Sequence, residues 1–185
     1  YMVPLLITYV IPQFAFTPVF IWLSKKYGKK RLWGAAMWVS AFMFILTFFV
    51  VTPGEFSYLI WPGTFIFGLC SGCAAVTAPS IKADIIDFDE YKTGERKEGA
   101  YLAVWNLIRK GAASLTALIT GLALQFSGFM PNIEQSEQVQ YWILGLFSLL
   151  PGICYFIGAI IFMGFSFNEK EHAAVRDVLE ARRGE

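Results

Sequence analysis

Two adjacent bases, Arg109 and Lys110, lie well inside the apolar stretch Ala100–Phe126. If this stretch crosses a bilayer, the pair lies near its middle, where one Arg or Lys costs at least about 2.5–3.5 kcal/mol of insertion free energy. Successive helical residues turn by about 100°, so the two bases cannot both face one groove. We therefore expect at least one to face the bundle interior or an aqueous pathway. A structural ion pair to another helix is the alternative.

Trp105 and Asn106 lie one helical turn before the two bases. Residues three or four positions apart share a helix face, so an aromatic ring and an amide lie close to the bases. Aromatic stacking beside hydrogen-bonding groups is how a site would hold a sugar-like polyol, and core filling is the alternative for Trp105. The four residues are the candidate solute site.

An acidic run, Asp84, Asp87 and Asp89, follows the third apolar stretch and is interleaved with bases. These carboxylates could chelate Mg²⁺ for diphosphate chemistry, as in membrane prenyltransferases, or serve as charges of a gate. Such enzymes need a second carboxylate cluster on another helix, and no other span end offers one. A gate that pairs with bases of a neighbouring bundle is the preferred interpretation, and a magnesium-dependent membrane transferase is the alternative.

The pair Cys70 and Cys73 has the C-x-x-C spacing of redox and zinc sites. The only histidine, His172, lies far away in the C-terminal tail. Small polarizable residues that pack between helices are therefore the expected role of these cysteines, and neither a metal site nor a disulfide framework is expected.

The elements that carry these residues are membrane helices. Hydrophobic residues make up 56% of the 185, charged residues 16%, and the mean hydropathy is +0.54. A soluble domain has about 45–50% apolar and about 25% charged residues. Long unbroken apolar stretches exclude a barrel, whose strands alternate. The sequence predicts an all-α polytopic bundle in a lipid bilayer with five transmembrane helices, near 2–23, 32–51, 58–81, 100–126 and 141–167.

The basic residues outside the spans fall in alternate connections. They lie between residues 24 and 31, between 82 and 99, and in the tail, whereas the second and fourth connections have none. The positive-inside rule places the basic segments in the cytoplasm. We expect a bundle at residues 1–167, a cytoplasmic tail at 168–185, and an outward-facing start at Tyr1. Such a start indicates the C-terminal piece of a longer protein.

Proline and glycine are dense in two spans. Pro4, Pro12 and Pro18 in the first predict a bent helix that lines a cavity. Gly68 and Gly72 in the third match the small-xxx-small pattern of close helix packing, which is the preferred interpretation.

Three parts of the chain resemble one transporter family. They are the basic run Pro18–Lys30, the acidic motif Ala83–Glu90 with Thr93–Gly99, and Lys110. All three resemble the glycoside-pentoside-hexuronide cation symporter family of the major facilitator superfamily. The resemblance implies the last five helices of a twelve-helix transporter, in a bacterial inner membrane and without enzymatic activity.

The resemblance also implies a function. It predicts Na⁺- or H⁺-coupled symport of a sugar, glycoside or related polar solute by alternating access, with a lipid-like or anionic solute as the alternative. Lys110 would line the solute pocket, with Trp105 and Asn106 beside it. Asp84, Asp87 and Arg96 would belong to a charged network that closes the cytoplasmic side. The missing N-terminal bundle would bind the coupling cation, and neither another cofactor nor a nucleic-acid partner is expected.

Overall fold

The computed structural model describes residues 2–52, 58–164 and Val175. All the regular structure in these residues is helical. The elements are α1 (Met2–Ala15), α2 (Thr17–Tyr27), α3 (Lys29–Val50), α4 (Ile60–Thr93), α5 (Glu98–Ser127), α6 (Glu137–Leu144), the π-helical turn η1 (Gly145–Leu149) and α7 (Leu150–Met163). The all-α prediction is confirmed. The expected tail, 168–185, lies outside the described residues apart from Val175.

The number of candidate spans agrees with the sequence prediction. Four helices are long and apolar enough to cross a membrane, with α6, η1 and α7 counted as one, and α1 with α2 makes a fifth. Their outer surfaces are strongly apolar: Phe14 is 70% exposed, Phe49 75% and Phe126 83%. Exposed apolar surface this extensive is typical of helices that have lipid rather than water around them.

The first span is bent as its prolines predict. α1 and α2 meet at Phe16 with an angle of 48° between them. Pro18 has no backbone N–H for the carbonyl of Phe14, and its ring crowds that carbonyl, so a straight helix cannot continue through this point. The same absence of an N–H at Pro151 coincides with the wider π-helical turn between α6 and α7.

The glycines of α4 let α1 approach closely. A Cβ built on Gly68 would lie 2.2 Å from the Tyr9 carbonyl oxygen, and one on Gly72 would lie 2.6 Å from that of Gln13. Any side chain at these positions would collide with the α1 backbone. The packing role predicted for the G-x-x-x-G pattern is confirmed.

Aromatic rings join α3 to its two neighbours. Phe44 on α3 lies 4.0 Å from the ring centroid of Phe67 on α4 and 5.7 Å from that of Tyr155 on α7. Nearer the start of α3, Cys73 of α4 is buried, and its thiol donates to the Leu32 carbonyl at 3.8 Å. The cysteine therefore packs between helices, as the sequence predicts.

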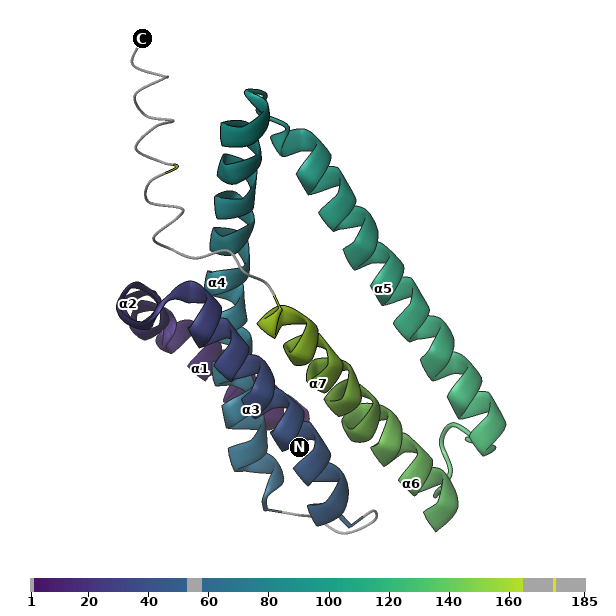
Figure 1. The fold of residues 1–185 in the computed structure, drawn as a ribbon. Coiled ribbons are helices and arrows are strands. Elements are labelled where there is room, and N and C mark those ends of the chain that lie inside the picture. Colours follow the sequence, from purple (N-terminus) through teal and green to yellow (C-terminus); the bar gives the residue numbers. More distant parts are fainter. Residues whose placement is uncertain (1, 53–57, 165–174, 176–185) are drawn as a thin grey trace.

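The third predicted span is longer than expected. α4 does not end near Ile81 but continues as a helix to Thr93, so the acidic run is helical rather than a loop. The 34 residues of α4 give a length of about 51 Å, well beyond the roughly 30 Å hydrocarbon core. Figure 1 shows α5 meeting α4 at the far end of this extension and then diverging from it. None of the residues of α5 is buried.

Candidate functional site

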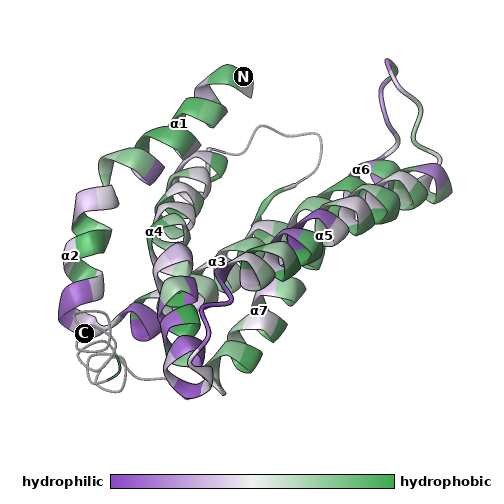
Figure 2. Ribbon diagram, turned by 90° about the horizontal axis from the view of Figure 1, so that it is seen from above, coloured by the Kyte–Doolittle hydropathy of each residue, from purple (hydrophilic) through white to green (hydrophobic). Residues whose placement is uncertain are grey.

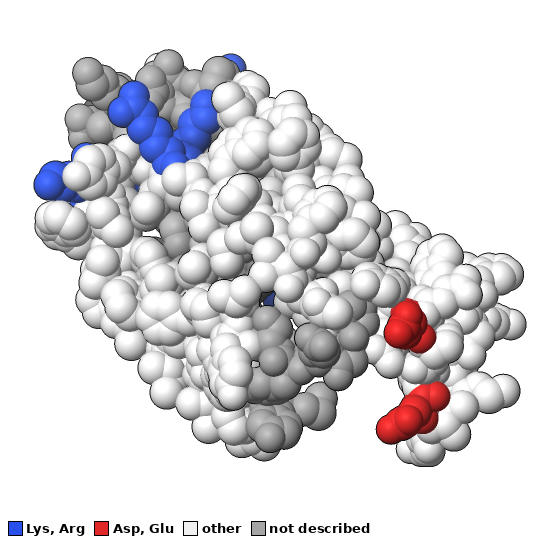
Figure 3. All heavy atoms as spheres, turned by 90° about the horizontal axis from the view of Figure 1, so that it is seen from below, with Lys and Arg blue, Asp and Glu red and all other residues white. Residues whose placement is uncertain are grey.

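Charged side chains gather at one end of the bundle, where α2 passes into α3 and α4 into α5. Figure 2 looks onto this end and shows hydrophilic segments there, while the lengths of the helices are apolar. The opposite view in Figure 3 is mostly uncharged, with basic atoms along the α2 edge and acidic ones at the α5–α6 side. We call the first region the charged end, formed by residues 25–31 and 82–98.

An ion pair between two helices is the main contact of the charged end. The Lys29 Nζ lies 2.9 Å from Oδ1 and 2.7 Å from Oδ2 of Asp84. Asp84 is buried, with its side chain only 9% exposed, whereas Lys29 is 25% exposed. Gly28, at a φ of 93°, makes the turn that places Lys29 at the first position of α3. Removing the partner of a buried carboxylate strongly destabilises the folded protein.

The sequence analysis did not identify Lys29 as a partner of Asp84. The structure also separates the three predicted gate residues. Arg96 contacts Glu90 at 3.6 Å and Glu98 at 3.1 Å, within the α4–α5 connection. Asp87 lies one helical turn beyond Asp84 on α4 and is half-buried. The charged network thus has two parts, one between α3 and α4 and one around Arg96. The clue to Lys29 was its place in the basic connection at the same end.

The magnesium alternative fits the helix poorly. At about 100° per residue, Asp84 and Asp89 point about 140° apart around α4, so one ion cannot contact both. No group of three His, Cys, Asp or Glu side chains that could hold a metal ion occurs in the described part of the chain. Asp84 is already engaged by Lys29.

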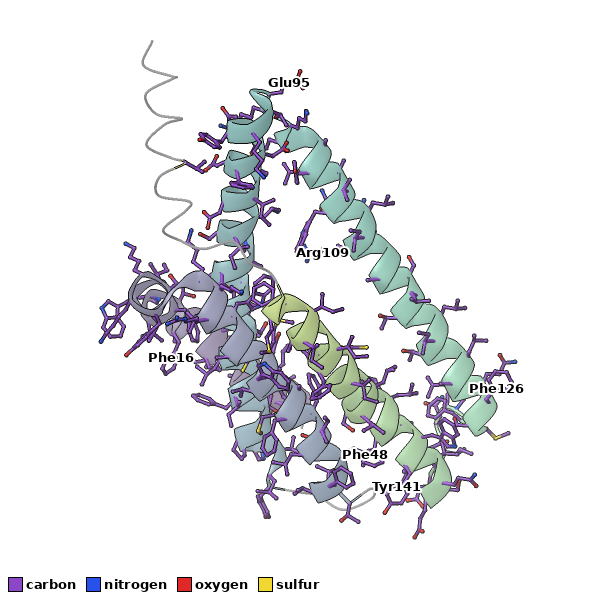
Figure 4. The ribbon with its side chains drawn as sticks, in the orientation of Figure 1. Phe16, Phe48, Glu95, Arg109, Phe126 and Tyr141 are labelled. Atoms are coloured by element: carbon purple, nitrogen blue, oxygen red, sulfur yellow. The ribbon has the colours of Figure 1, made fainter. Side chains whose placement is uncertain are left out.

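The four predicted solute-site residues are all exposed on α5. Trp105 makes a cation–π contact with another helix, because the Lys82 Nζ of α4 lies 5.3 Å from the centre of its ring. Arg109 lies about 40° from Trp105 around the helix, Asn106 about 100° and Lys110 about 140°. The structure therefore brings Arg109 and Trp105 onto one face and turns Lys110 away from it. Figure 4 labels Arg109 on the part of α5 that stands apart from the other helices.

The face with Trp105 and Arg109 is the one that α5 turns to the bundle. Farther along the helix, Ile119 and Ala123 lie within about 40° of the direction of Trp105. Both line a largely apolar cavity of about 670 Å³ whose other walls come from α3, α6, η1 and α7. Trp105 thus faces the other described helices, and Arg109 lies about 40° to one side of it.

The contact with Lys82 shows where the two bases lie along the bundle. It sets Trp105 beside the part of α4 that carries Asp84, which is two residues from Lys82. Arg109 lies one turn, or about 6 Å, farther along α5. The position of the two bases in the bilayer stays a prediction.

A second cavity escaped the sequence analysis. It measures about 250 Å³ and lies where α1, α3, α4 and α7 meet. Five of its lining residues carry hydroxyl groups, namely Tyr9, Ser40, Thr64, Ser71 and Tyr155, and the Tyr9 hydroxyl donates to that of Ser71 at 2.8 Å. None of the predicted site residues lines it.

Comparisons with known proteins agree on a transport family. The family model described as MFS/sugar transport protein matches residues 2–169. An uncharacterized symporter of Bacillus subtilis is 28% identical over 162 residues, which cover 83% of this chain and 33% of the relative.

Two further relatives carry names for a solute. A Salmonella typhimurium protein named "Putative sulfoquinovose importer" is 30% identical over 171 residues, covering 86% of this chain and 33% of the relative. An Escherichia coli protein named "Putative 2,3-dihydroxypropane-1-sulfonate exporter" is 25% identical over 163 residues, covering 86% and 34%. The chain spans about a third of the length of these relatives.

Proposed function

Since this chain belongs to the MFS/sugar transport protein family, we propose that it is the C-terminal part of a secondary transporter for a sugar, glycoside or related polar solute, coupled to Na⁺ or H⁺. The transporter would lie in a bacterial inner membrane with the charged end in the cytoplasm. Two helical bundles would rock around a solute held between them, which is alternating access. The upstream part of the protein would supply the other bundle and the site of the coupling cation.

The polar stretch of α5 is the observation that carries this proposal. Trp105, Asn106, Arg109 and Lys110 are all exposed on a helix that is otherwise apolar enough to cross a membrane. Charge and amide groups at such a place cost insertion free energy, and by default they indicate a solute or ion pathway. Asn106 and Lys110 lie about 40° apart around α5, so their amide and ammonium groups can bind one polyhydroxyl solute held between the two bundles.

The charged end supports the proposal as a gate. Lys29 and Asp84 tie α3 to α4 at the end where the cytoplasmic side would open. Asp87 and Arg96 would pair with bases and acids of the other bundle when this side closes. A difference of about 1.4 kcal/mol between the two end states changes their ratio about tenfold, so a few ion pairs are enough to bias the cycle.

Uptake by the full-length protein tests the proposal. Proteoliposomes would receive radiolabelled hexoses, glycosides and their acidic derivatives under an imposed Na⁺ or H⁺ gradient. We expect accumulation that collapses when an ionophore dissipates the gradient and that is lost in Lys110→Ala. Lys25→Ala, an exposed base on α2, is the matched control and should transport normally. Absence of gradient-driven flux in either direction, or a Mg²⁺-dependent transferase product, would refute the proposal.

A further inference from the structure

The cavity where α1, α3, α4 and α7 meet has no role in the proposed gate or solute site. We call it the hydroxyl cavity, after the five hydroxyl-bearing residues that line it. One of them, Ser40, lies close to the middle of α3. At a rise of about 1.5 Å per residue, each end of α3 is about 15 Å away from it. The hydroxyl cavity therefore lies at mid-span, far from both ends of a helix that is apolar enough to cross a membrane.

The hydroxyl groups offer more hydrogen-bonding sites than the contacts of the cavity wall use. Tyr9 of α1 donates to Ser71 of α4 at 2.8 Å, and Thr64 donates to the Ile60 carbonyl of its own helix at 2.7 Å. Each hydroxyl has one donor and two acceptor sites. Lipid supplies neither donors nor acceptors, so a polar guest inside the cavity lowers the free energy of the remaining sites.

The size and the charge of the hydroxyl cavity favour water as this guest. The cavity measures about 250 Å³, and one water molecule takes about 30 Å³ in the liquid, so several fit. All the described residues that line it are uncharged. A cation at mid-span would therefore lack the counter-charge that offsets the loss of its hydration shell.

A neighbouring cavity provides a route for water. It measures about 210 Å³ and lies between the second half of α3 and the start of α4, where Val51 and Leu59 line it at the end opposite the charged end. Thr64 and Phe67 line both cavities. These two side chains are thus a shared wall, and water that passes them reaches mid-span.

We propose that the hydroxyl cavity is a hydration site, which holds a cluster of ordered water molecules that enter past Thr64 and Phe67 from the end opposite the charged end. The water molecules bridge hydroxyl groups of α1, α3, α4 and α7. They thereby connect the bent first span to helices of the bundle through contacts that exchange with solvent. This site is separate from the four residues proposed for the solute on α5, and it does not depend on the transport function.

Thiol accessibility in the full-length protein tests the hydration. A buried thiol in apolar surroundings is inert, because the reactive species is the thiolate. Ser40→Cys places a thiol on the cavity wall, whereas Thr77→Cys places one where neither cavity reaches. The two positions are matched, since Ser40 is 3% exposed and Thr77 1%. With the native cysteines replaced by alanine, we expect 2-aminoethyl methanethiosulfonate to modify Ser40→Cys about tenfold faster or more.

Radiolytic labelling of the otherwise unchanged full-length protein detects the water itself. X-ray pulses split ordered water into hydroxyl radicals, which oxidise the side chains next to it. Phe44 and Phe48 are both half-buried on α3, but Phe44 lines the hydroxyl cavity and Phe48 lines the apolar cavity beside α5. We expect oxidation of Phe44 and none, or much less, of Phe48.

The direction of entry is tested in intact cells. An impermeant trimethylammonium methanethiosulfonate should modify Ser71→Cys from the side that labels Glu134→Cys, which lies at the end opposite the charged end. Modification from the other side alone would overturn the route. Equally slow modification of Ser40→Cys and Thr77→Cys, or equal oxidation of Phe44 and Phe48, would show that the hydroxyl cavity is dry and overturn the hydration site. Loss of transport activity would leave the site standing, because none of these measurements uses a solute.

Discussion

Lys29, the first residue of α3, holds both carboxylate oxygens of Asp84 on α4, at 2.9 and 2.7 Å from its Nζ. The acid is buried and the base is partly exposed. The pair therefore joins two neighbouring helices at the end of the bundle where the chain makes its basic turn. Because the carboxylate has lost most of its water, removing its partner costs more free energy than breaking a surface ion pair.

Breaking this pair from one side should destabilise the protein. Asp84→Asn leaves the Lys29 ammonium without its counter-charge, and we expect a loss of about 1–3 kcal/mol in the free energy of unfolding. Lys29→Gln strands a buried carboxylate and should cost more. The charge-swapped variant with Lys29→Asp and Asp84→Lys should recover part of the loss. Thermal unfolding of the full-length protein measures these three variants and the double variant of Lys29→Gln with Asp84→Asn. Additive effects of the two single substitutions in that double variant, without coupling, would show that the pair does not form.

Asp87 and Lys110 should have opposite effects on the transport cycle. Asp87→Asn should favour the state that is open at the charged end, which impairs accumulation while solute binding remains measurable. Lys110→Ala should abolish binding without a comparable change in accessibility. Cysteine labelling at the charged end measures its accessibility, and binding titrations measure the affinity for the solute. Loss of binding in Asp87→Asn with unchanged accessibility would assign the acidic run to the solute or to a metal instead.

The apolar pattern predicts the helices well because lipid-exposed helices must be continuous and long. The bend near Pro18 and the close approach at Gly68 also follow from local chemistry, since each depends on a missing N–H or a missing Cβ. Hydropathy failed at the acidic run after Ile81. A helix that leaves the bilayer keeps its backbone hydrogen bonds while its side chains become polar, so hydropathy records the membrane boundary and not the end of α4.

The site was harder to predict than the fold. Residue types identified the bases of α5 and the acids of α4, but their partners depend on how helices far apart in sequence are placed. Lys29 reaches Asp84, and Lys82 reaches Trp105, only because α3 and α5 lie on different sides of α4. A single sequence gives the helix face of each side chain and does not give the helix that it faces.

The close contact of α1 and α4 predicts a sharp difference between two glycines. Gly68→Ala places a Cβ against the Tyr9 carbonyl, and we expect overpacking to cost about 1–3 kcal/mol. Gly121→Ala on α5 meets nothing within 4 Å and should be neutral or gain up to about 1 kcal/mol, because alanine favours the helix. Thermal unfolding of both variants in the same detergent makes the comparison. Equal midpoints would mean that α1 does not pack on Gly68.

The last prediction concerns the sidedness of the bundle. The positive-inside rule places Lys25 in the cytoplasm and Glu134, in the connection between α5 and α6, outside. Both side chains are exposed, and Lys25 is a better reporter than the ion-paired Lys29. In full-length protein whose native cysteines are replaced by alanine, an impermeant maleimide added to intact cells should label Glu134→Cys and spare Lys25→Cys. Permeabilised cells should show labelling of both, which establishes that each thiol is reactive. Labelling of Lys25→Cys in intact cells would reverse the orientation and place the Lys29–Asp84 pair on the outer side, so that the proposed cytoplasmic gate would fail with it.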